Sequence, residues 1–332
     1  MHIQNAIRLL RETCALQHLA LNTEKSYTQW LARYAAFLNA PGPKPLEKAE
    51  HKIEAFLTSL ALAGVSASTQ NQAFNALLFF YRFVLKQDLT NISALRARRP
   101  AALRHCPARE EVDKLLAQVG DAHGYPTRLI AHLIYGCGLR VCEPLNLRIK
   151  DLDLPKRRLH IHQSKGNKGR VVLFPNCLVP ALERQLALAR ALAAEDFARG
   201  IPVALPGLLA KKFPYAQRSE RWAWLFPSKS VCLDPRAKKL VRWRCHEANV
   251  QRAVKAAATR CHLQGITPHH LRHAFATHAL HDGAFVRDLQ VVLGHNHLDT
   301  TMLYLHTEAG RVASPLHEYA SAPNLATVGG MP

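Results

Sequence analysis

Six side chains in the second half of the chain could together break and rejoin a phosphodiester. They are two arginines, one lysine, two histidines and one tyrosine: Arg140, Lys165, His269, Arg272, His295 and Tyr304. His295 closes a Leu-Gly-His run, and Tyr304 follows it within the same short segment. A nucleophile and groups that can stabilise charge are therefore close along the chain. This set suits phosphodiester transesterification without a metal ion.

The arginines, the tyrosine and the lysine would have different tasks in such a reaction. Negative charge grows on the non-bridging oxygens during attack, and two guanidiniums can pair with these oxygens bidentately. Positioned charge of this kind commonly contributes most to catalysis. A tyrosine hydroxyl, with an ordinary pKa of about 10, would need a cationic, His-rich pocket to attack. Lys165, at a glycine-flanked turn, could give the leaving 5′-oxygen its proton.

His269 and Arg272 begin a helix that can hold an anion. Thr267 is a good N-cap, a proline follows it, and the N–H groups of a helix start attract phosphate. Residues three apart share a helix face, so His269 and Arg272 would face the same ligand. Taken singly, each of the six residues also has an ordinary structural interpretation, such as an ion pair between Arg140 and Glu143. One reaction that needs all of them favours the chemical interpretation.

The composition indicates a nucleic-acid partner. The chain has 332 residues, with 44 basic and 24 acidic residues and a formal net charge of +20. Charge of this sign favours a polyanion, and its spread along the chain favours nucleic acid over a membrane surface. No apolar run reaches the roughly 20 residues of a membrane span, and the N-terminus lacks a signal-peptide pattern. We expect a cytoplasmic protein with no membrane association.

Neither a metal site nor a cofactor is expected. The eight cysteines are scattered without a CxxC pair, and no Cys/His cluster has the spacing of zinc ligands. No group of acidic residues suggests magnesium, and two arginines can replace the metal ions that many nucleases use. The cysteines are expected to be reduced thiols.

The hydrophobic periodicity predicts a mainly α-helical fold with a small antiparallel β-sheet in the C-terminal domain. Helices are expected from Asn22 or Thr23 onward and over 51–63 and 68–86, and in the second domain over 110–119, 127–135, 180–197, 249–261, 267–281, 286–293 and 300–306. Strands are expected over 158–162 and 170–174, joined by a hairpin turn that carries Lys165. Residues 200–228 are expected to be irregular.

These elements suggest two domains of unequal size. We expect a helical bundle over 1–95, a basic linker over 96–107, a second domain over 108–316 and a loose tail over 317–332. An extra insertion lies within the second domain at about 190–228.

The six residues and their surroundings resemble the tyrosine recombinase (phage integrase) family in order and spacing. The matching motifs are Gly-Leu-Arg140, the Lys165 hairpin, the run from His269 to His278, Leu-Gly-His295 and Tyr304. The resemblance implies a helical core-binding (SAM-like) domain and a catalytic domain that form a two-domain DNA clamp. It also implies a homotetramer on DNA, with the segment after about Thr307 docked on a neighbouring protomer.

The same resemblance assigns roles to the six residues. Arg140, Arg272, His269 and His295 would hold the scissile phosphate, and Lys165 would be the general acid. Tyr304 would form a 3′-phosphotyrosyl intermediate that conserves the bond energy for religation without ATP.

A finer resemblance is to the integron integrases, which insert and excise gene cassettes. It rests on the extra segment at 200–216, on residues 222–227 and on residues 67–73. In that subfamily the extra segment helps to recognise bases flipped out of folded single-stranded sites, and aromatic side chains and cations suit that task. The corresponding candidates for DNA binding are Lys211, Lys212, Trp222, Trp224, Arg242 and Arg244. Trp222 and Trp224 could equally be hydrophobic anchors of the insertion.

Three alternatives stay open from the sequence. The first is a duplex-specific recombinase of the Xer or phage type, which would use the same chemistry on ordinary sites. The second is a DNA-binding regulator without catalysis, against which the complete set of six residues argues. The third is a type IB topoisomerase, which the two-domain organisation and the insertion fit less well.

Overall fold

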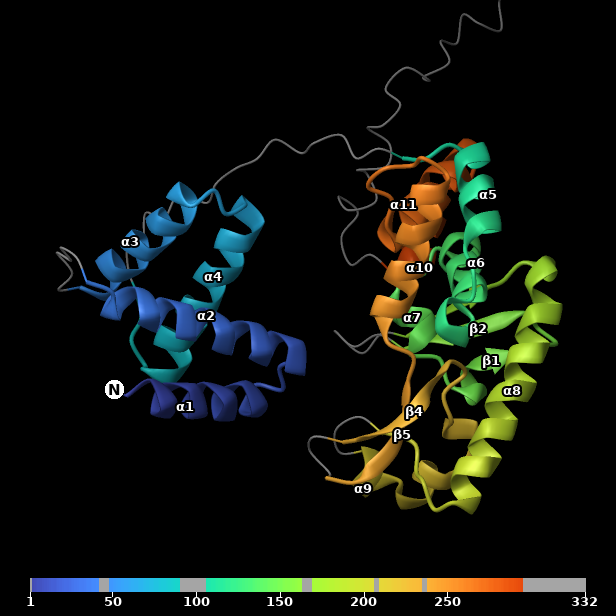
Figure 1. The fold of residues 1–332 in the computed structure, drawn as a ribbon, viewed down its shortest axis with the longest axis horizontal. Helices are drawn as coiled ribbons and strands as arrows, with labels where there is room; N and C mark the ends of the chain where they lie inside the picture. The colour runs from blue at the N-terminus through green and yellow to red at the C-terminus, as the bar shows by residue number, and fades with distance from the viewer. Residues whose placement is uncertain are drawn as a thin grey trace, which may run out of the picture. The chain divides into compact units, whose positions relative to one another are not determined.

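The chain divides in its computed structural model into two compact units, Met1–Ala102 and Leu103–Pro332. The structure describes residues 2–41, 48–89, 106–162, 169–205, 209–234 and 238–294. Helices dominate both units, and the second unit adds small antiparallel sheets, which confirms the predicted fold class (Figure 1). Among the described residues, no helix is long and apolar enough to cross a membrane.

The first unit is a helical bundle. Its helices are α1 (Ile3–Leu16), α2 (Leu21–Asn39), α3 (Ala49–Leu62) and α4 (Ala67–Phe79), and a π-helical turn (Phe80–Val84) extends α4. Leu10, Ile53 and Leu77 are fully buried in its core. The predicted start of α2 at Asn22 or Thr23 was wrong: the helix begins at Leu21 after Ala20, without a side-chain cap.

The predicted helix over 68–86 differs from the structure in its last turn. The chain widens into π-helix there, and the N–H of Leu85 donates to the carbonyl of Phe80 at 3.1 Å. The wider turn buries both Phe80 and Tyr81, and the Tyr81 hydroxyl lies 3.0 Å from that of Tyr34 on α2. A regular helix would direct consecutive side chains about 100° apart, so the pattern did not reveal this turn.

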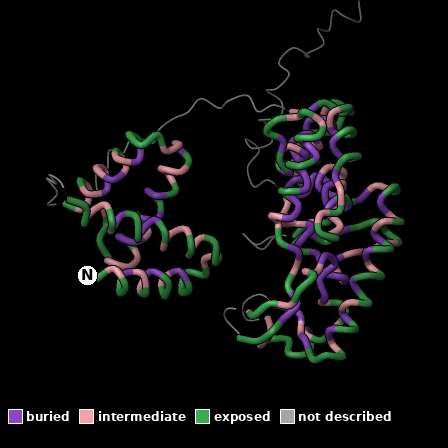
Figure 2. The backbone as a smooth tube through the Cα atoms, viewed as in Figure 1, coloured by how far each residue is buried: buried purple, intermediate pink, exposed green. Residues whose placement is uncertain are grey.

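The second unit has a helical end and an insertion end. Its helices are α5 (Arg109–Gln118), α6 (Thr127–Cys137), α7 (Cys142–Leu145), α8 (Val179–Ala198), α9 (Leu209–Lys212), α10 (Glu247–Arg260), α11 (Pro268–His281) and α12 (Val286–Leu293). Figure 1 shows α5, α6, α10 and α11 together at one end, and the β4–β5 hairpin with α9 at the other. Figure 2 shows the buried residues gathered between these helices.

Two antiparallel sheets complete the part of the second unit that the structure describes. Strands β1 (Leu152–Asp153), β2 (Arg158–Ile161) and β3 (Arg170–Leu173) form the first, in which Leu159 pairs with Val172 and both are buried. This confirms the two predicted strands. The second sheet, β4 (Pro227–Leu233) and β5 (Leu240–Arg244), was not predicted. Most of β4 is exposed, so it lacks the alternation of apolar and polar residues that marks a half-buried strand.

Gly138 determines how the chain leaves α6. It caps the helix in the left-handed conformation, with φ of 62°, and a Cβ there would lie 2.4 Å from the Phe275 ring. Only glycine allows both the turn and this close approach. The turn buries Leu139 and brings Arg140 to the start of α7.

Candidate active site

Three arginines from distant parts of the chain surround the carboxylate of Glu143, the second residue of α7. Arg140 donates from Nη1 to Oε1 at 2.9 Å and from its backbone N–H to Oε2 at 2.8 Å. Arg170 on β3 binds both carboxylate oxygens, at 2.9 and 2.8 Å. Arg272 on α11 places Nη1 3.6 Å from Oε2. We call these four residues the Glu143 cluster; its formal charge is positive, with three guanidiniums on one carboxylate.

The same three arginines bind consecutive carbonyl groups at the end of α12. Arg170 donates from Nε to the carbonyl of Val292 at 2.6 Å. Arg272 donates to Leu293 at 2.7 Å, and Arg140 donates to Gly294 at 3.1 Å. Cations stabilise the C-terminal end of a helix, where carbonyl groups lack intrahelical partners. The cluster therefore joins α7, β3 and α11 to the chain immediately before His295.

The arginines keep Glu143 ionised. Burial alone would raise the pKa of Glu143, but hydrogen bonds and charge from Arg170, the backbone N–H of Arg140 and the charge of Arg272 together hold that pKa below its ordinary value. The ionised carboxylate therefore contributes stability above the ordinary glutamate pKa. That contribution is lost as the pH falls through the lowered pKa of the folded state.

The two predicted catalytic arginines differ in the exposure of their side chains. The side chain of Arg272 is 3% exposed, and it also donates to the carbonyl of Gly138 at 2.9 Å. The side chain of Arg140 is 44% exposed. Backbone carbonyls therefore fix the buried Arg272 side chain, whereas the Arg140 side chain of the same cluster is partly exposed.

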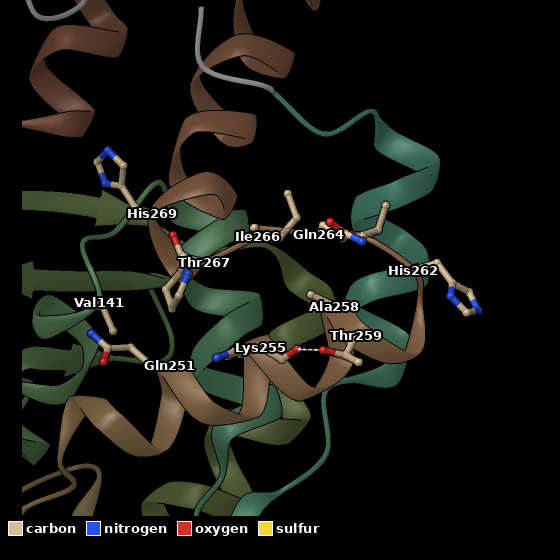
Figure 3. Close-up of a pocket in the computed structure, with 13 residues that line it drawn as sticks. Val141, Gln251, Lys255, Ala258, Thr259, His262, Gln264, Ile266, Thr267 and His269 are labelled. Atoms are coloured by element: carbon tan, nitrogen blue, oxygen red, sulfur yellow. Dashed lines mark hydrogen bonds between the residues drawn. The ribbon is translucent and has the colours of Figure 1, made fainter. Parts of the chain in front are cut away.

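His269 lies on the first turn of α11, as predicted from the sequence. Thr267 is the N-cap residue, and Nδ1 of His270 accepts from its backbone N–H at 3.2 Å. His269 is exposed, and with Val141 it lines one end of a pocket of about 880 Å³ (Figure 3). Gln251, Lys255 and Thr259, on the exposed side of α10, also line this pocket. Because Val141 follows Arg140, the pocket adjoins the arginine cluster.

The structure thus brings together Arg140 and Arg272 on one carboxylate, with His269 on the same helix as Arg272. Lys165, His295 and Tyr304 lie outside the described residues, as do the predicted helix over 300–306 and the tail over 317–332. Most of the predicted linker over 96–107 is also outside them.

Sequence reasoning missed Arg170 and assigned Glu143 only a possible ion pair. Glu143 lies three residues after Arg140, a spacing that placed it within reach. For Arg170 the available signal was its place as the first residue of a strand directly after the Lys165 hairpin. Its contacts with α7 and α12 could not be inferred from that position.

Arg242, one of the predicted DNA-binding residues, is a buried structural residue. Its Nε and Nη2 each donate to Asp196 on α8 at 2.6 Å. Its Nη1 donates to the carbonyls of Ser228 and Lys229, at 3.1 and 2.7 Å. Only 6% of the side chain is exposed. A guanidinium with these partners cannot also reach a phosphate, which contradicts the prediction that Arg242 binds DNA.

Trp224 is buried as well. Its Nε1 donates to the carbonyl of Arg242 at 3.2 Å, and the Arg148 guanidinium lies 3.7 Å from its ring centroid. Arg148 donates to the carbonyls of Trp222 and Ala204, and burial lowers the pKa of Arg148 to about 10. Trp224 therefore anchors the insertion to Arg148, the residue before the 3₁₀ turn Ile149–Asp151. This is the structural alternative left open by the sequence.

The other candidates in the insertion remain near the surface. Trp222 is half-buried and stacks on Phe213, with ring centroids 6.2 Å apart, and Lys150 Nζ lies 3.3 Å from the Trp222 centroid. Lys212 lies beside Phe213, and Tyr215 is 92% exposed. We call Lys150, Lys212, Phe213, Tyr215 and Trp222 the insertion face. The side chain of Lys211 is outside the described part of the chain, and Arg244 is half-buried with one hydrogen bond to the Cys245 carbonyl.

Replacing Asp196 with asparagine is expected to destabilise the second unit. The Arg242 charge would lose its carboxylate while staying buried, which costs about 3–5 kcal/mol. Chemical denaturation measures this change in the free energy of unfolding. Glu195→Gln is the matched control, because the neighbouring Glu195 side chain is 63% exposed and pairs with Arg199, also exposed, at 3.4 Å. Equal stability of the two variants would contradict a structural role for the Arg242–Asp196 pair.

Within the described residues, no three His, Cys, Asp or Glu side chains gather in a way that could hold a metal ion. The arrangement instead offers two fixed guanidiniums and an exposed histidine beside a pocket. Groups of this kind can pair with the oxygens of an anion such as a phosphodiester.

Comparisons with known proteins identify the family of the chain. Residues 108–311 match the model of the phage integrase family, and residues 7–91 match that of its N-terminal SAM-like domain. An integrase/recombinase of Escherichia coli is 39% identical over 300 residues, which covers 90% of this chain and 88% of that protein. The tyrosine recombinase XerD of Agrobacterium fabrum is 31% identical, covering 86% of this chain and 85% of its own length.

Two solved structures share the fold. The site-specific recombinase XerH bound to its difH substrate has a TM-score of 0.63 and 22% identity, covering 92% of this chain and 81% of that one. A lambda integrase dimer bound to a core site has a TM-score of 0.61 and 15% identity, covering 94% and 97%. The chain belongs to the phage integrase family of tyrosine recombinases.

Proposed function

We propose that this protein is a site-specific DNA recombinase that cleaves and rejoins DNA through a 3′-phosphotyrosyl intermediate. The observation that carries the proposal is the anchoring of Arg140 and Arg272 on one carboxylate, with His269 exposed on the same helix as Arg272. Fixed guanidiniums stabilise a phosphoryl transition state without having to reorganise during the reaction. Tyr304 is the proposed nucleophile, Lys165 the general acid, and His295 a further donor to the phosphate.

DNA is the proposed partner, and a homotetramer on two sites is the proposed assembly. The net charge of +20 supports a polyanionic partner. The XerH structure was solved bound to its difH substrate, and the lambda integrase structure bound to a core site. The exposed residues of α10 beside the pocket, Gln251, Lys255 and Thr259, can hydrogen-bond with base edges or phosphates.

A covalent capture experiment tests the proposed activity. Nicked oligonucleotides with randomised arms lose the short strand beyond the cleavage point, so that religation fails and the protein stays linked to DNA. Products that survive denaturation are sequenced to identify the DNA and digested for mass spectrometry to identify the linked residue. A 3′-phosphate ester on Tyr304 is expected. No adduct from either duplex or hairpin pools would instead favour a DNA-binding regulator.

We further propose that the substrates are folded single-stranded cassette sites of the kind used by integron integrases. The insertion face supports this, because the stacked Phe213 and Trp222 with adjacent lysines can hold unpaired bases. A duplex-specific Xer-type function is the second candidate, which the relatives named XerD support.

Strand preference distinguishes these two candidates. The captured site is prepared as each separate strand and as a duplex, and band shifts measure the affinity for each. We expect one folded strand to bind best, and Trp222→Ala to weaken that binding by about 1–3 kcal/mol through lost stacking. Leu188→Ala, at an exposed position of α8, is the control. Equal affinity for both strands and the duplex would contradict the cassette-site proposal.

A further inference from the structure

Arg170 is the guanidinium of the Glu143 cluster that the predicted catalytic set does not contain. It is the first residue of β3, and its side chain is 6% exposed. Its Nη1 and Nη2 bind the two oxygens of Glu143, and its Nε binds the carbonyl of Val292. These buried bonds face the protein interior, so Arg170 is poorly placed to contact a phosphate itself.

The first effect of Arg170 is on charge. A carboxylate beside Arg140 and Arg272 would offset part of the positive charge that they offer to a phosphate. Arg170 pairs bidentately with Glu143, at 2.9 and 2.8 Å. The more exposed Arg140 guanidinium makes a single contact at 2.9 Å, and Arg272 lies at 3.6 Å. A bidentate pair at low exposure is the strongest of these contacts. The negative charge of Glu143 is therefore balanced chiefly by Arg170.

The second effect of Arg170 is on the end of α12. It holds the carbonyl of Val292, while Arg272 and Arg140 hold the next two carbonyls, those of Leu293 and Gly294. The backbone to which the two catalytic arginines are anchored is thus tied to β3 as well. His295 directly follows Gly294 in the sequence.

We propose that Arg170 is a positioning residue for DNA cleavage: it balances the charge of Glu143 and fixes the end of α12. The positive charge of Arg140 and Arg272 then stays available to the phosphodiester, and their guanidiniums stay oriented toward it. This inference rests on the cleavage reaction proposed above. It assigns Arg170 no contact with the substrate.

Arg170→Gln tests the proposal with the covalently captured oligonucleotide as probe. The single-turnover rate of adduct formation is expected to fall about 10- to 100-fold, because small misplacements of catalytic groups have effects of this size. The dissociation constant for the same DNA is expected to stay within about twofold, because many phosphate contacts share the affinity. Arg158→Gln, which removes the same charge from an exposed position of β2, is the control and should cleave at the wild-type rate.

Two further variants separate positioning from a general loss of stability. Arg170→Lys keeps the charge but loses the bidentate geometry, so its rate is expected between those of wild type and Arg170→Gln. The double variant Arg170→Gln with Glu143→Gln removes the unbalanced carboxylate and is expected to cleave at least about fivefold faster than Arg170→Gln, a coupling of the size seen for contacting residues. Melting temperatures are measured for all variants.

The pH profile is a readout that a purely structural role would not move. Among the described residues, the charged and titratable groups that interact with Glu143 besides Arg170 are Arg140, Arg272 and the thiol of Cys142, whose pKa of about 11 keeps it neutral. Removing Arg170 raises the pKa of Glu143. Protonation removes the unbalanced carboxylate as Glu143→Gln does, so the rate deficit of Arg170→Gln relative to wild type should narrow as the pH falls through that raised pKa.

The outcomes are distinct. Wild-type cleavage by Arg170→Gln, or by Arg170→Lys if the glutamine variant does not fold, would overturn the proposal. So would a parallel loss of DNA affinity, which would indicate a direct phosphate contact, or strictly additive effects in the double variant. If wild-type protein forms no adduct, the proposed function itself fails, and the inference fails with it.

Discussion

Tyr304→Phe is expected to abolish the covalent protein–DNA product while DNA binding stays nearly unchanged. The hydroxyl is the proposed nucleophile, so no phosphotyrosyl bond can form without it. One hydroxyl adds little to an affinity that phosphate contacts dominate. Denaturing gels with the captured oligonucleotide measure the product, and fluorescence anisotropy measures binding.

A structural tyrosine provides the control for this experiment. The hydroxyl of Tyr125 accepts from the backbone N–H of Lys229 at 3.2 Å, so Tyr125→Phe removes a hydroxyl from the same unit without touching the proposed chemistry. That variant should form the adduct at the wild-type rate. Adduct formation by Tyr304→Phe would show that another residue is the nucleophile, and the linked peptide would identify it.

The helices that position the site could be predicted because their ends carry local signals. Thr267 and the proline after it mark the start of α11, and Gly138 and Gly294 end α6 and α12 in the left-handed conformation. Such caps depend on a few neighbouring residues, which a sequence displays directly. Arg140 and Arg272 could be selected because one reaction requires both.

The long-range contacts of the arginines could not be predicted in the same way. Arg170 and Arg242 are similar residues at strand positions, yet one holds Glu143 and the other Asp196. Each partner lies far away in the sequence, and only packing of the elements brings it near. Net positive charge favours a polyanionic partner, but it did not reveal which basic residues are buried.

The insertion shows a second reason why part of the structure could not be predicted from the sequence. The half-exposed strands β4 and β5 lack a clear alternation of apolar and polar residues. Arg242 on β5 binds Asp196 of α8, and Trp224, just before β4, packs on Arg148. Aromatic and basic residues in an irregular, proline-containing segment look like a nucleic-acid surface. Here some of these aromatic and basic residues are buried and anchor the insertion, whereas others belong to the insertion face.

Arg272→Lys is expected to lower the cleavage rate by about 10²- to 10³-fold, the effect of losing one positioned donor to a transition-state oxygen. The guanidinium of Arg272 donates to the carbonyls of Gly138 and Leu293, at 2.9 and 2.7 Å, and these bonds fix its plane. A lysine ammonium keeps the charge but lacks the planar fork that could hold both carbonyls and a phosphate at once. Binding of the captured oligonucleotide should therefore persist while adduct formation fails.

Arg109→Lys is the matched control, because Arg109 also donates to a backbone carbonyl of α11, that of His278 at 3.1 Å, and pairs with Asp282 at 2.6 Å. It changes the same chemical group on α5, where Arg109 holds the end of α11 that is opposite to His269. If both variants lost activity equally, the loss would reflect general disturbance of α11. A large loss confined to Arg272→Lys would show that cleavage depends on the guanidinium held by the Glu143 cluster, since charge and helix anchoring are matched between the two.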